Sequence, residues 1–486
     1  MKKILHAALL LSLTMLAAAP AAGQATADLE KLVNQTRREA GMRNGTLSVC
    51  VYNATTGKQI YSHNAEASVT PASVQKLITT GVGFALLGSE FRFTTKMNAR
   101  GEIDRDGVLH GNIYITGGGD PLLGSYRYRQ TMPDTLFEGW TTALKKKGIR
   151  RIDGRVCYNV SVFDEQPLHD SWQWGDVGNY YAAGVSGLNF HENMYFVYFN
   201  AGKKLGYPAT VVRTVPKNID IHGASEVTTA GENTGDQVIV YGSPTGKERI
   251  YRGTVPLGKK DFAVRAAMPN PAKTCADLFS SYLRTHGVGV SSNSMQVYTV
   301  PDSLRSVLDY RSSSYYTIAQ YTNLTSNNIY AESIFKYLGY HKYGLGSFQN
   351  GAKTVVEWLK GKGLDAEGVR VVDGSGLSRL NRVTTDFLCR YLTAMSKESF
   401  FDEFMQTIAK AGENGTAKNL LPGLPAGITV HVKTGTMDGV KSYAGYVLTP
   451  HGQTLAFAIV SNNHDDSAAD VGGKLNKILY KIATMY

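Results

Sequence analysis

The chain has few cysteines, and they are far apart. Its 486 residues contain four: Cys50, Cys157, Cys275 and Cys389. No pair of them has the short spacing of a zinc or redox site, so the sequence predicts neither a metal nor a cofactor. Cys50 and Cys389 stand in apolar surroundings and are expected to be core residues. An oxidising compartment would permit a disulfide, and the sequence alone does not pair the four.

No long hydrophobic run follows the first residues of the chain. Met-Lys-Lys and the apolar run over residues 4–19 are typical of a secretory signal peptide, with cleavage expected after Gly23 and Ala25 as the alternative. The run is shorter than a spanning helix requires. We therefore expect an exported protein with no integral membrane segment after signal cleavage, periplasmic if the host has an outer membrane. An uncleaved anchor is the alternative.

Runs of lysine and arginine are also missing, although the formal net charge is +11. The absence of a basic run argues against nucleic acid as a partner. The net positive charge falls by two when Lys2 and Lys3 leave with the signal peptide, and the remaining charge suits an anionic polymer as a partner. A basic surface of this kind is also common in proteins without such a partner.

Two copies of the pattern Ser-x-x-Lys are present, at Ser73–Lys76 and Ser333–Lys336. Thr70 and Pro71 before the first copy predict an N-cap and a first helical residue, followed by a largely apolar helix. Ser73 and Lys76 would then share one face of that helix near its start. The second copy lies inside an amphipathic helix predicted over residues 329–338, where Ser333 is expected at the surface. The first copy is therefore the predicted nucleophile site.

Two further motifs follow in a fixed order. Ser-x-Asn occurs four times, and the copy Ser326-Asn-Asn328 is favoured because it lies in a polar loop just before a helix. The others begin at Ser62, Ser291 and Ser461, which are predicted in strands or a turn. Lys433-Thr-Gly435 occurs once, after an alternating strand over residues 428–432. Alone, this tripeptide would read equally well as a strand ending in a turn.

These three motifs together are those of a serine acyl-transfer site. A serine hydroxyl becomes nucleophilic when a neighbouring base takes its proton, and a lysine held neutral can be that base. We therefore expect Ser73 to be the nucleophile and Lys76 the general base. Burial and a second nearby cation lower the pKa of a lysine, and Lys433 is the expected second cation.

In these motifs and their order, the chain resembles the low-molecular-mass class C penicillin-binding proteins, the D-alanyl-D-alanine carboxypeptidase/endopeptidase family. The resemblance implies that Ser326 relays a proton to the leaving D-alanine and that Asn328 holds the substrate amide. It assigns the terminal carboxylate to Lys433, Thr434 and Thr436, and the oxyanion hole to the amides of Ser73 and Thr436. Gly435 would let the substrate lie against the strand edge. Peptidoglycan stem peptides and β-lactams are the implied partners.

The resemblance also implies an architecture. The expected fold is α/β, with a β-lactamase/transpeptidase-like three-layer domain formed by residues 24–92 and 312–486. The long stretch between Ser73 and Ser326, residues 93–311, is glycine-rich and has many short strand candidates. It is expected to be an inserted β-rich segment with two subdomains. Near the C-terminus, a hairpin over residues 443–448 and 454–460 and a last helix over residues 468–483 are predicted.

Within this insertion, an aromatic and acidic patch is a possible side-chain pocket. Members of the family place aromatic residues and an acid here to grip the amine end of the stem side chain, which Trp172, Asp176 and Tyr180 would match. Met437, just after the Lys-Thr-Gly-Thr run, lines the same pocket in some relatives. A carboxylate flanked by aromatic rings suits an ammonium group. The alternative is that the aromatic residues form the core of the insertion.

Three functions remain open from the sequence. The first is a D,D-carboxypeptidase that also cuts D-alanyl cross-links, and the second is a β-lactamase of the same superfamily. The long insertion and the lack of an obvious deacylating glutamate argue against the second. The third is a non-catalytic penicillin-sensing or wall-binding protein, against which the intact motifs argue. The sequence leaves the oligomeric state open, a dimer included.

Overall fold

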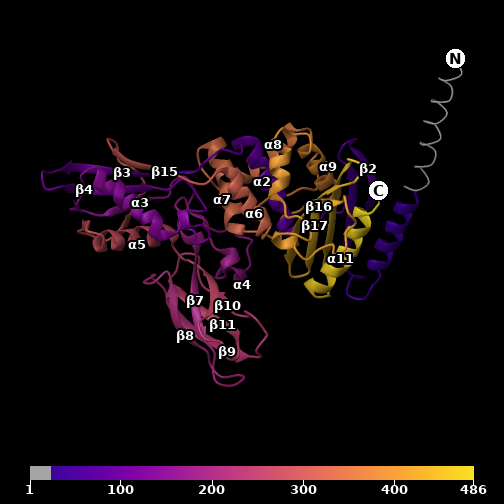
Figure 1. Ribbon diagram of the computed structural model, residues 1–486, viewed down its shortest axis with the longest axis horizontal. Coiled ribbons are helices and arrows are strands. Elements are labelled where there is room, and N and C mark those ends of the chain that lie inside the picture. Colours follow the sequence, from indigo (N-terminus) through magenta and orange to yellow (C-terminus); the bar gives the residue numbers. More distant parts are fainter. Residues whose placement is uncertain (1–22, 486) are drawn as a thin grey trace, which may run out of the picture.

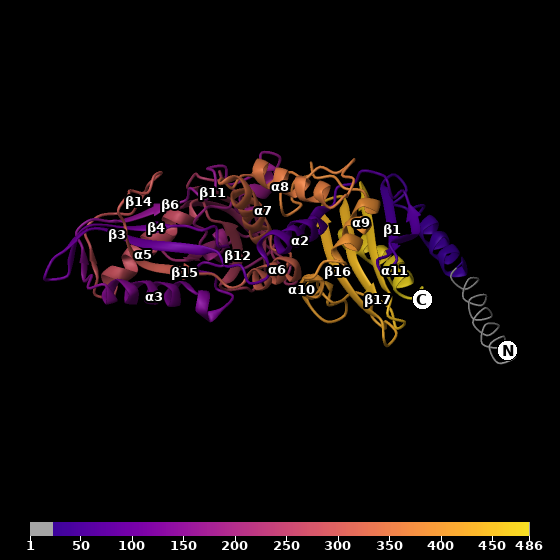
Figure 2. The same ribbon diagram turned by 90° about the horizontal axis from the view of Figure 1, so that it is seen from above.

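A computed structural model describes residues 23–485, so most of the predicted signal peptide lies outside the described residues. Figures 1 and 2 show an elongated molecule. The strands and helices from the two ends of the chain lie together at one end of it, and residues of the long insertion form the other. We call the part of the molecule formed by the two ends of the chain the terminal half. The chain leaves it after helix α2 (Gln75–Leu87) and returns to it at helix α6 (Tyr315–Leu324).

A five-stranded antiparallel sheet, with the order β16-β17-β18-β1-β2, is the centre of the terminal half. Its strands are β1 (Thr46–Asn53), β2 (Lys58–His63), β16 (Thr429–Met437), β17 (Val440–Leu448) and β18 (Thr454–Asn462). The register places Lys433 opposite Ala444 and Gly435 opposite Ser442. Strand β16 is at an edge of this sheet, and on its outer side residues 409–411 pair with the first part of the strand.

Side chains of this sheet alternate between two hydrophobic clusters. In β18, Ala456 and Ala458 belong to one cluster, whereas Leu455 and Phe457 belong to the other. Successive residues of a strand point to opposite faces, so both faces of the sheet are buried. Helices therefore cover the sheet on both sides, and the domain has the expected three layers.

Helices of the first face surround the segment that carries Ser73. They are α2 (Gln75–Leu87), α6 (Tyr315–Leu324), α7 (Asn328–Tyr343), α8 (Phe348–Gly361), α9 (Thr385–Met395) and α10 (Phe401–Thr407). The opposite face is covered by α11 (Ala468–Ala483) and by a helix over residues 23–36. The predicted hairpin and last helix are confirmed.

The predicted N-cap before Ser73 is wrong. Thr70 does not cap a helix: a 3-10 turn, Ala72–Val74, precedes α2, and no side-chain cap is present at its start. The Thr70 hydroxyl instead accepts from Arg382, and its backbone pairs with the Asn462 side chain. The alternative for Lys-Thr-Gly, a strand that ends in a turn, is excluded because β16 continues through it to Met437.

The insertion contains two groups of strands. The first is a seven-stranded sheet made of β3 (Thr94–Ile103), β4 (Val108–Thr116), β5 (Arg151–Ile152), β6 (Val156–Asn159), β13 (Gly289–Val290), β14 (Met295–Gln296) and β15 (Arg305–Arg311). Helices α3 (Pro133–Lys146) and α5 (Pro271–Thr285) pack on it around Trp140 and Phe279.

The second group has two three-stranded sheets. One consists of β7 (Met194–Asn200), β8 (Thr210–Val215) and β12 (Phe262–Ala267), and the other of β9 (His222–Ala230), β10 (Ile239–Tyr241) and β11 (Glu248–Pro256). A separate core that includes Tyr195 and Tyr251 joins them. We propose that these two groups are the two subdomains of the insertion. The short helix α4 (Trp174–Val177) lies between the second group and the terminal half.

Three further observations concern the part of the chain that the structure describes. None of its helices combines the length and the apolar character needed to cross a membrane. Within residues 23–485, no cluster of three or more histidine, cysteine or acidic side chains is arranged to hold a metal ion. All four cysteines are buried and free, and Cys50 and Cys389 lie in the core as expected.

Candidate active site

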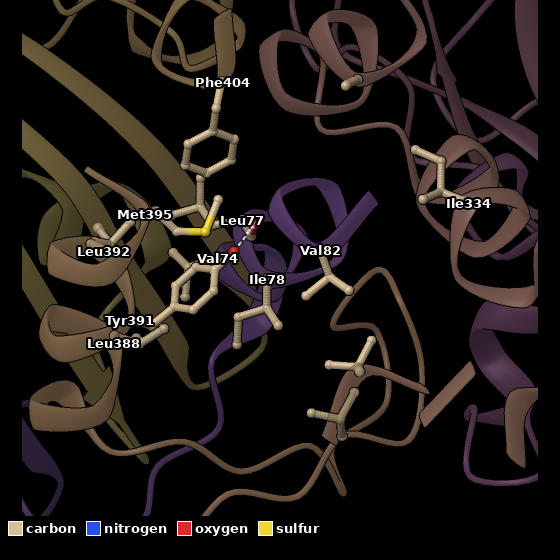
Figure 3. Packing of buried hydrophobic residues seen from close by; sticks show 14 of the residues in the cluster. Val74, Leu77, Ile78, Val82, Ile334, Leu388, Tyr391, Leu392, Met395 and Phe404 are labelled. Carbon is tan, nitrogen blue, oxygen red and sulfur yellow. Dashed lines mark hydrogen bonds between the residues drawn. The ribbon is translucent and has the colours of Figure 1, made fainter. Parts of the chain in front are cut away.

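Helix α2 is held firmly because its apolar face is buried in the main core. Figure 3 shows Leu77, Ile78 and Val82 packed among residues of α7, α9 and α10. The hydroxyl of Tyr391 donates to the Leu77 carbonyl over 3.0 Å. The start of α2, with the preceding 3-10 turn, is thereby fixed against the sheet, and Ser73 and Lys76 are held on one side of it.

The side-chain nitrogen of Lys76 contacts residues of three segments of the chain. Its Nζ lies 2.9 Å from Ser73 Oγ, 2.6 Å from Asn328 Oδ1 and 2.7 Å from the Ser375 carbonyl. A neutral amine has two N–H groups and one lone pair. If it donates to Asn328 and Ser375, its lone pair is left facing the Ser73 hydroxyl. This arrangement suits a lysine that accepts a proton from Ser73.

Burial favours this neutral form of Lys76. The side chain is fully buried, and desolvation lowers its pKa to about 7. The negative charges of Glu332 and Asp373 act in the opposite direction and raise the pKa. The expected lowering of this pKa by Lys433 stays a prediction. Burial, and repulsion between the two lysines, hold the pKa of Lys433 well below its usual value.

The Ser-Asn-Asn segment lies where a loop enters α7. Ser326 has a φ of 56°, which is uncommon for a residue other than glycine, and Asn327 caps the helix by accepting from the Tyr330 amide. Asn328, the first helical residue, donates through Nδ2 to the Tyr181 carbonyl over 2.7 Å. This bond turns the Asn328 Oδ1 toward Lys76. The oxygen and the nitrogen of the Asn328 side-chain amide are thus both hydrogen-bonded.

Lys433 brings the Lys-Thr-Gly strand to the same place. Its buried Nζ donates to Ser326 Oγ over 2.9 Å and to the Thr434 carbonyl over 2.7 Å. Two lysines from different elements therefore each contact a serine hydroxyl, Lys76 that of Ser73 and Lys433 that of Ser326. This brings the three sequence motifs together in one site.

Gly435 permits the strand to approach the Ser73 turn. A Cβ at this position would lie 2.2 Å from Ser442 Oγ and 2.9 Å from the Ser73 nitrogen. The Ser442 hydroxyl also donates to the Pro71 carbonyl over 2.6 Å. Glycine is thus needed because other atoms of the protein lie where its side chain would be. The sequence analysis had instead predicted that the substrate would use this space.

The remaining predicted residues of β16 are near its exposed edge. The Thr434 hydroxyl donates to Thr416 over 2.8 Å, and the Thr436 hydroxyl accepts from Lys441 over 2.8 Å. Met437 is half-buried and is the last residue of the strand. An edge strand next to Ser73 offers unpaired backbone groups to an extended peptide.

Glu332 and Asp373 are buried beside Lys76, and the sequence analysis missed Glu332. Glu332, one turn along α7 from Asn328, accepts from the amides of Gly374 and Ser375, both over 2.8 Å. It thereby fixes the loop whose Ser375 carbonyl binds Lys76. Burial and the charge of Asp373 raise the pKa of Glu332 to about 8. Its position four residues after Asn328 is the signal that would have identified it.

Trp172 is buried in the insertion and is hydrogen-bonded to the loop that contains Asp373 and Ser375. It is 7 % exposed, and its indole N–H donates to Asp373 Oδ2 over 2.9 Å. Asp176 accepts from the Tyr181 hydroxyl over 3.0 Å. The face of Tyr180 is covered by the guanidinium of Arg265, 3.6 Å from the ring centroid. The three residues predicted to grip an ammonium group are thus engaged with other protein groups.

The second Ser-x-x-Lys copy is not a surface feature. Ser333 and Lys336 are both fully buried. Ser333 accepts from Asn189 over 3.2 Å, and Lys336 forms an ion pair with Asp164 over 2.6 Å. The prediction that Ser333 lies at the helix surface is wrong, because the insertion packs over that face of α7. The lysine of this copy is directed to a carboxylate and not to its serine.

A cavity of about 360 Å³ opens beside Ser326 and Asn328. Its walls combine residues of the terminal half with Arg127, Tyr180, Tyr181, Glu192, Met194 and Arg265 of the insertion. No motif in the sequence marked Arg127, Glu192 or Arg265. They come from separate strands and loops, and only the packing of the insertion brings them together.

A serine beside a buried lysine at the start of a helix, with a second lysine on the adjacent edge strand, defines a serine acyl-transfer enzyme. Residues 26–477 match the D-Ala-D-Ala carboxypeptidase 3 (S13) family, and the chain belongs to this family of serine peptidases. It is 28% identical over 94% of its length to a D-alanyl-D-alanine carboxypeptidase of Actinomadura sp. (strain R39), of which the alignment covers 86%.

A solved structure has the same fold. Penicillin binding protein 4 (dacB) from Haemophilus influenzae superposes with a TM-score of 0.79 at 24% identity, over 94% of this chain and 99% of that one. A second structure of that protein, complexed with a novel β-lactam, superposes with a TM-score of 0.75 at 23% identity, over 94% of this chain and 98% of the other. The match spans nearly the whole chain, including the insertion.

Proposed function

We propose that this peptidase hydrolyses the terminal D-alanyl-D-alanine bond of peptidoglycan stem peptides through an acyl-enzyme on Ser73, and that it also cuts D-alanyl cross-links. The observation that carries the proposal is the Lys76 amine, buried and bound to two acceptors besides Ser73 Oγ. Such an amine can take the serine proton without a histidine.

The acylation step then uses these groups in order. Ser73 Oγ attacks the carbonyl carbon of the penultimate D-alanine while its proton passes to Lys76 Nζ. The amides of Ser73 and Thr436 hold the oxyanion, where one such donor is worth about 3–4 kcal/mol of barrier. The C–N bond breaks as Ser326 gives its proton to the departing amine and receives the proton held by Lys76. Both side chains thereby return to their starting states, while Lys433 Nζ remains bonded to Ser326 Oγ.

Substrate binding would use the outer edge of β16. The extended stem pairs with the strand, and its terminal carboxylate lies against Lys433 and the hydroxyls of Thr434 and Thr436. Met437 lines the adjoining side-chain pocket. Asn328 Oδ1 keeps a second lone pair beside its bond to Lys76, with which it accepts from the substrate amide. Water then attacks the acyl-enzyme, with Lys76 again as the base.

β-Lactams would acylate Ser73 by the same route and leave slowly. In this proposal the protein acts outside the cytoplasm, in the periplasm of a host with an outer membrane. The apolar start of the sequence and the family's substrate, a cell-wall peptide, support that location.

Intact-protein mass after mixing with benzylpenicillin, together with D-alanine release from a stem pentapeptide, tests the proposal. Wild type should gain the penicilloyl mass and release D-alanine, and Ser73→Ala should do neither. Ser333→Ala is the matched control, because it changes the serine of the other Ser-x-x-Lys copy, and it should still acylate. Acylation without D-alanine release would favour a penicillin-sensing protein. Acylation of Ser73→Ala would contradict the site itself.

A further inference from the structure

The cavity beside Ser326 begins at the active site and extends into the insertion. Ser326 and Asn328 line it, and these same residues contact Lys433 and Lys76. On the opposite wall are Arg127 and Arg265. A volume of about 360 Å³ holds several amino-acid side chains, which is more than a free D-alanine would fill.

One positive charge in this cavity is already neutralised. Arg127 binds the buried carboxylate of Glu192 through Nε over 2.6 Å and Nη2 over 3.0 Å. The same carboxylate accepts from the Ser125 hydroxyl over 2.7 Å and the Tyr330 hydroxyl over 2.8 Å. Glu192 therefore has little capacity left for another cation.

The other positive charge lacks an ion-pair partner. Among residues 23–485, no carboxylate lies within ion-pairing distance of Arg265, whose guanidinium instead stacks on Tyr180 at 3.6 Å. Burial raises the pKa of the Asp236 carboxyl, and the charge of Arg265 acts against this rise from a distance, without an ion pair. The guanidinium of Arg265 also hydrogen-bonds the Tyr126 side chain. Its remaining N–H groups are suited to bind a carboxylate.

A second feature favours an anion at the same place. Helix α7, Asn328–Tyr343, begins at the cavity wall, since Asn328 and Ile329 are among the lining residues. The N-terminus of a helix carries partial positive charge. Two guanidinium groups, one carboxylate and this helix end leave the cavity with net positive charge, so an ammonium group is disfavoured there.

We infer that this cavity is the subsite for the second stem peptide of a cross-link, on the amine side of the bond that is cut, and that Arg265 binds a carboxylate of that stem. The inference rests on the proposed function, in which Ser326 gives its proton to the leaving amine. Whatever is attached to that amine must continue past Ser326, where the cavity opens. In D-alanine release the leaving group is small, whereas in cross-link cleavage it is a second anionic peptide.

The test compares two substrates with one set of variants. Wild type, Arg265→Gln and Arg265→Lys are assayed for D-alanine release from a stem pentapeptide and for cleavage of a purified cross-linked dimer of two tetrapeptide stems. In Arg265→Gln, the ratio of kcat/KM for the dimer to kcat/KM for the pentapeptide should fall about tenfold, mainly through KM for the dimer. Arg265→Lys should retain part of the ratio.

Arg213→Gln is the matched control. Arg213 also lies on a strand of the second strand group and stacks on a tyrosine, Tyr198, at 3.5 Å, but it does not line the cavity. Its substitution should leave both activities as in wild type. An unchanged ratio in Arg265→Gln, or an equal fall in Arg213→Gln, would overturn the inference. Failure of wild type on both substrates would instead overturn the proposed function.

An amidated dimer tests which carboxylate Arg265 binds. In the proposed function, the carboxylate next to the leaving amine takes the place of the terminal carboxylate against Lys433, so the carboxylate for Arg265 is the one at the C-terminus of the second stem. With a dimer that carries an amide at that C-terminus, cleavage by wild type should fall to the level of Arg265→Gln. If wild type cleaves this dimer as fast as the unmodified one, the inference is wrong.

Discussion

Lys76 Nζ lies 2.9 Å from Ser73 Oγ although the lysine is completely buried. A buried ammonium is costly unless it is paired, and no carboxylate oxygen of the described residues forms an ion pair with Lys76. Its other two contacts are an amide oxygen and a carbonyl oxygen. This pair therefore favours a neutral amine that can receive the serine proton.

The acylation rate should rise with pH and then level off at about pH 7. Burial lowers the pKa of Lys76 to about 7, and only the neutral amine accepts the proton, so the rate should fall tenfold for each unit below that value. The second-order rate constant for benzylpenicillin, measured from about pH 5 to 9, checks this. A rate that keeps rising toward the usual lysine pKa would show that Lys76 is not held neutral.

Replacing Lys76 by arginine should nearly abolish acylation. Arginine keeps the charge but cannot lose its proton at neutral pH, so the rate constant should fall by at least about 10³. Lys342→Arg, an exposed substitution on α7, should have no effect on the rate. Retention of more than a tenth of the wild-type rate in Lys76→Arg, with the melting temperature unchanged, would rule out the general-base role.

Gly435→Ala should slow acylation by about 10²-fold, because the new Cβ would meet Ser442 Oγ and the Ser73 nitrogen and would push β16 away from the turn. Gly473→Ala on α11 is the control. A Cβ there has nothing within 4 Å, and alanine should raise the free energy of unfolding by about 0.5–1 kcal/mol. Acylation by nitrocefin or benzylpenicillin measures the change in rate, and thermal unfolding measures the change in stability. Equal acylation by the two variants would contradict the close approach.

Asp373→Asn should destabilise the protein by about 1–3 kcal/mol. The carboxylate accepts from Trp172, Gly376, Ser378 and Asn381, and an asparagine N–H₂ would face donors in place of an acceptor. Denaturant unfolding measures the change. Asp365→Asn, at an exposed site, should change stability by less than about 0.5 kcal/mol. If the two substitutions cost the same, the loop does not depend on the Asp373 carboxylate.

Sequence patterns predicted those parts of the fold that depend on neighbouring residues. The hairpin of β17 and β18 and helix α11 have their apolar residues in the periods of a strand and a helix, and both were confirmed. The errors at Thr70 and Ser333 have the opposite origin. Thr70 is drawn to Arg382 and Asn462, and Ser333 is covered by the insertion, and both are contacts between segments distant in sequence.

The candidate site divides in the same way. Three short motifs in a fixed order indicated Ser73, Lys76, Ser326 and Lys433, because the chemistry of acyl transfer restricts the residue types. Nothing local indicated that Trp172 would bind Asp373 or that Arg265 would cover Tyr180. The first contact depends on how the insertion packs against the terminal half, and the second on how distant segments of the insertion pack together. No short-range pattern encodes either.

The sequence by itself determined the class of chemistry, the order of the motifs and the helices and strands at the two ends of the chain. Only the tertiary structure decided the protonation state of Lys76. Its partners Asn328 and Ser375 are 252 and 299 residues away along the chain, and its burial results from the packing of α2 against the main core. The pKa of an amine depends on its surroundings in space, and those surroundings exist only after the distant segments have come together.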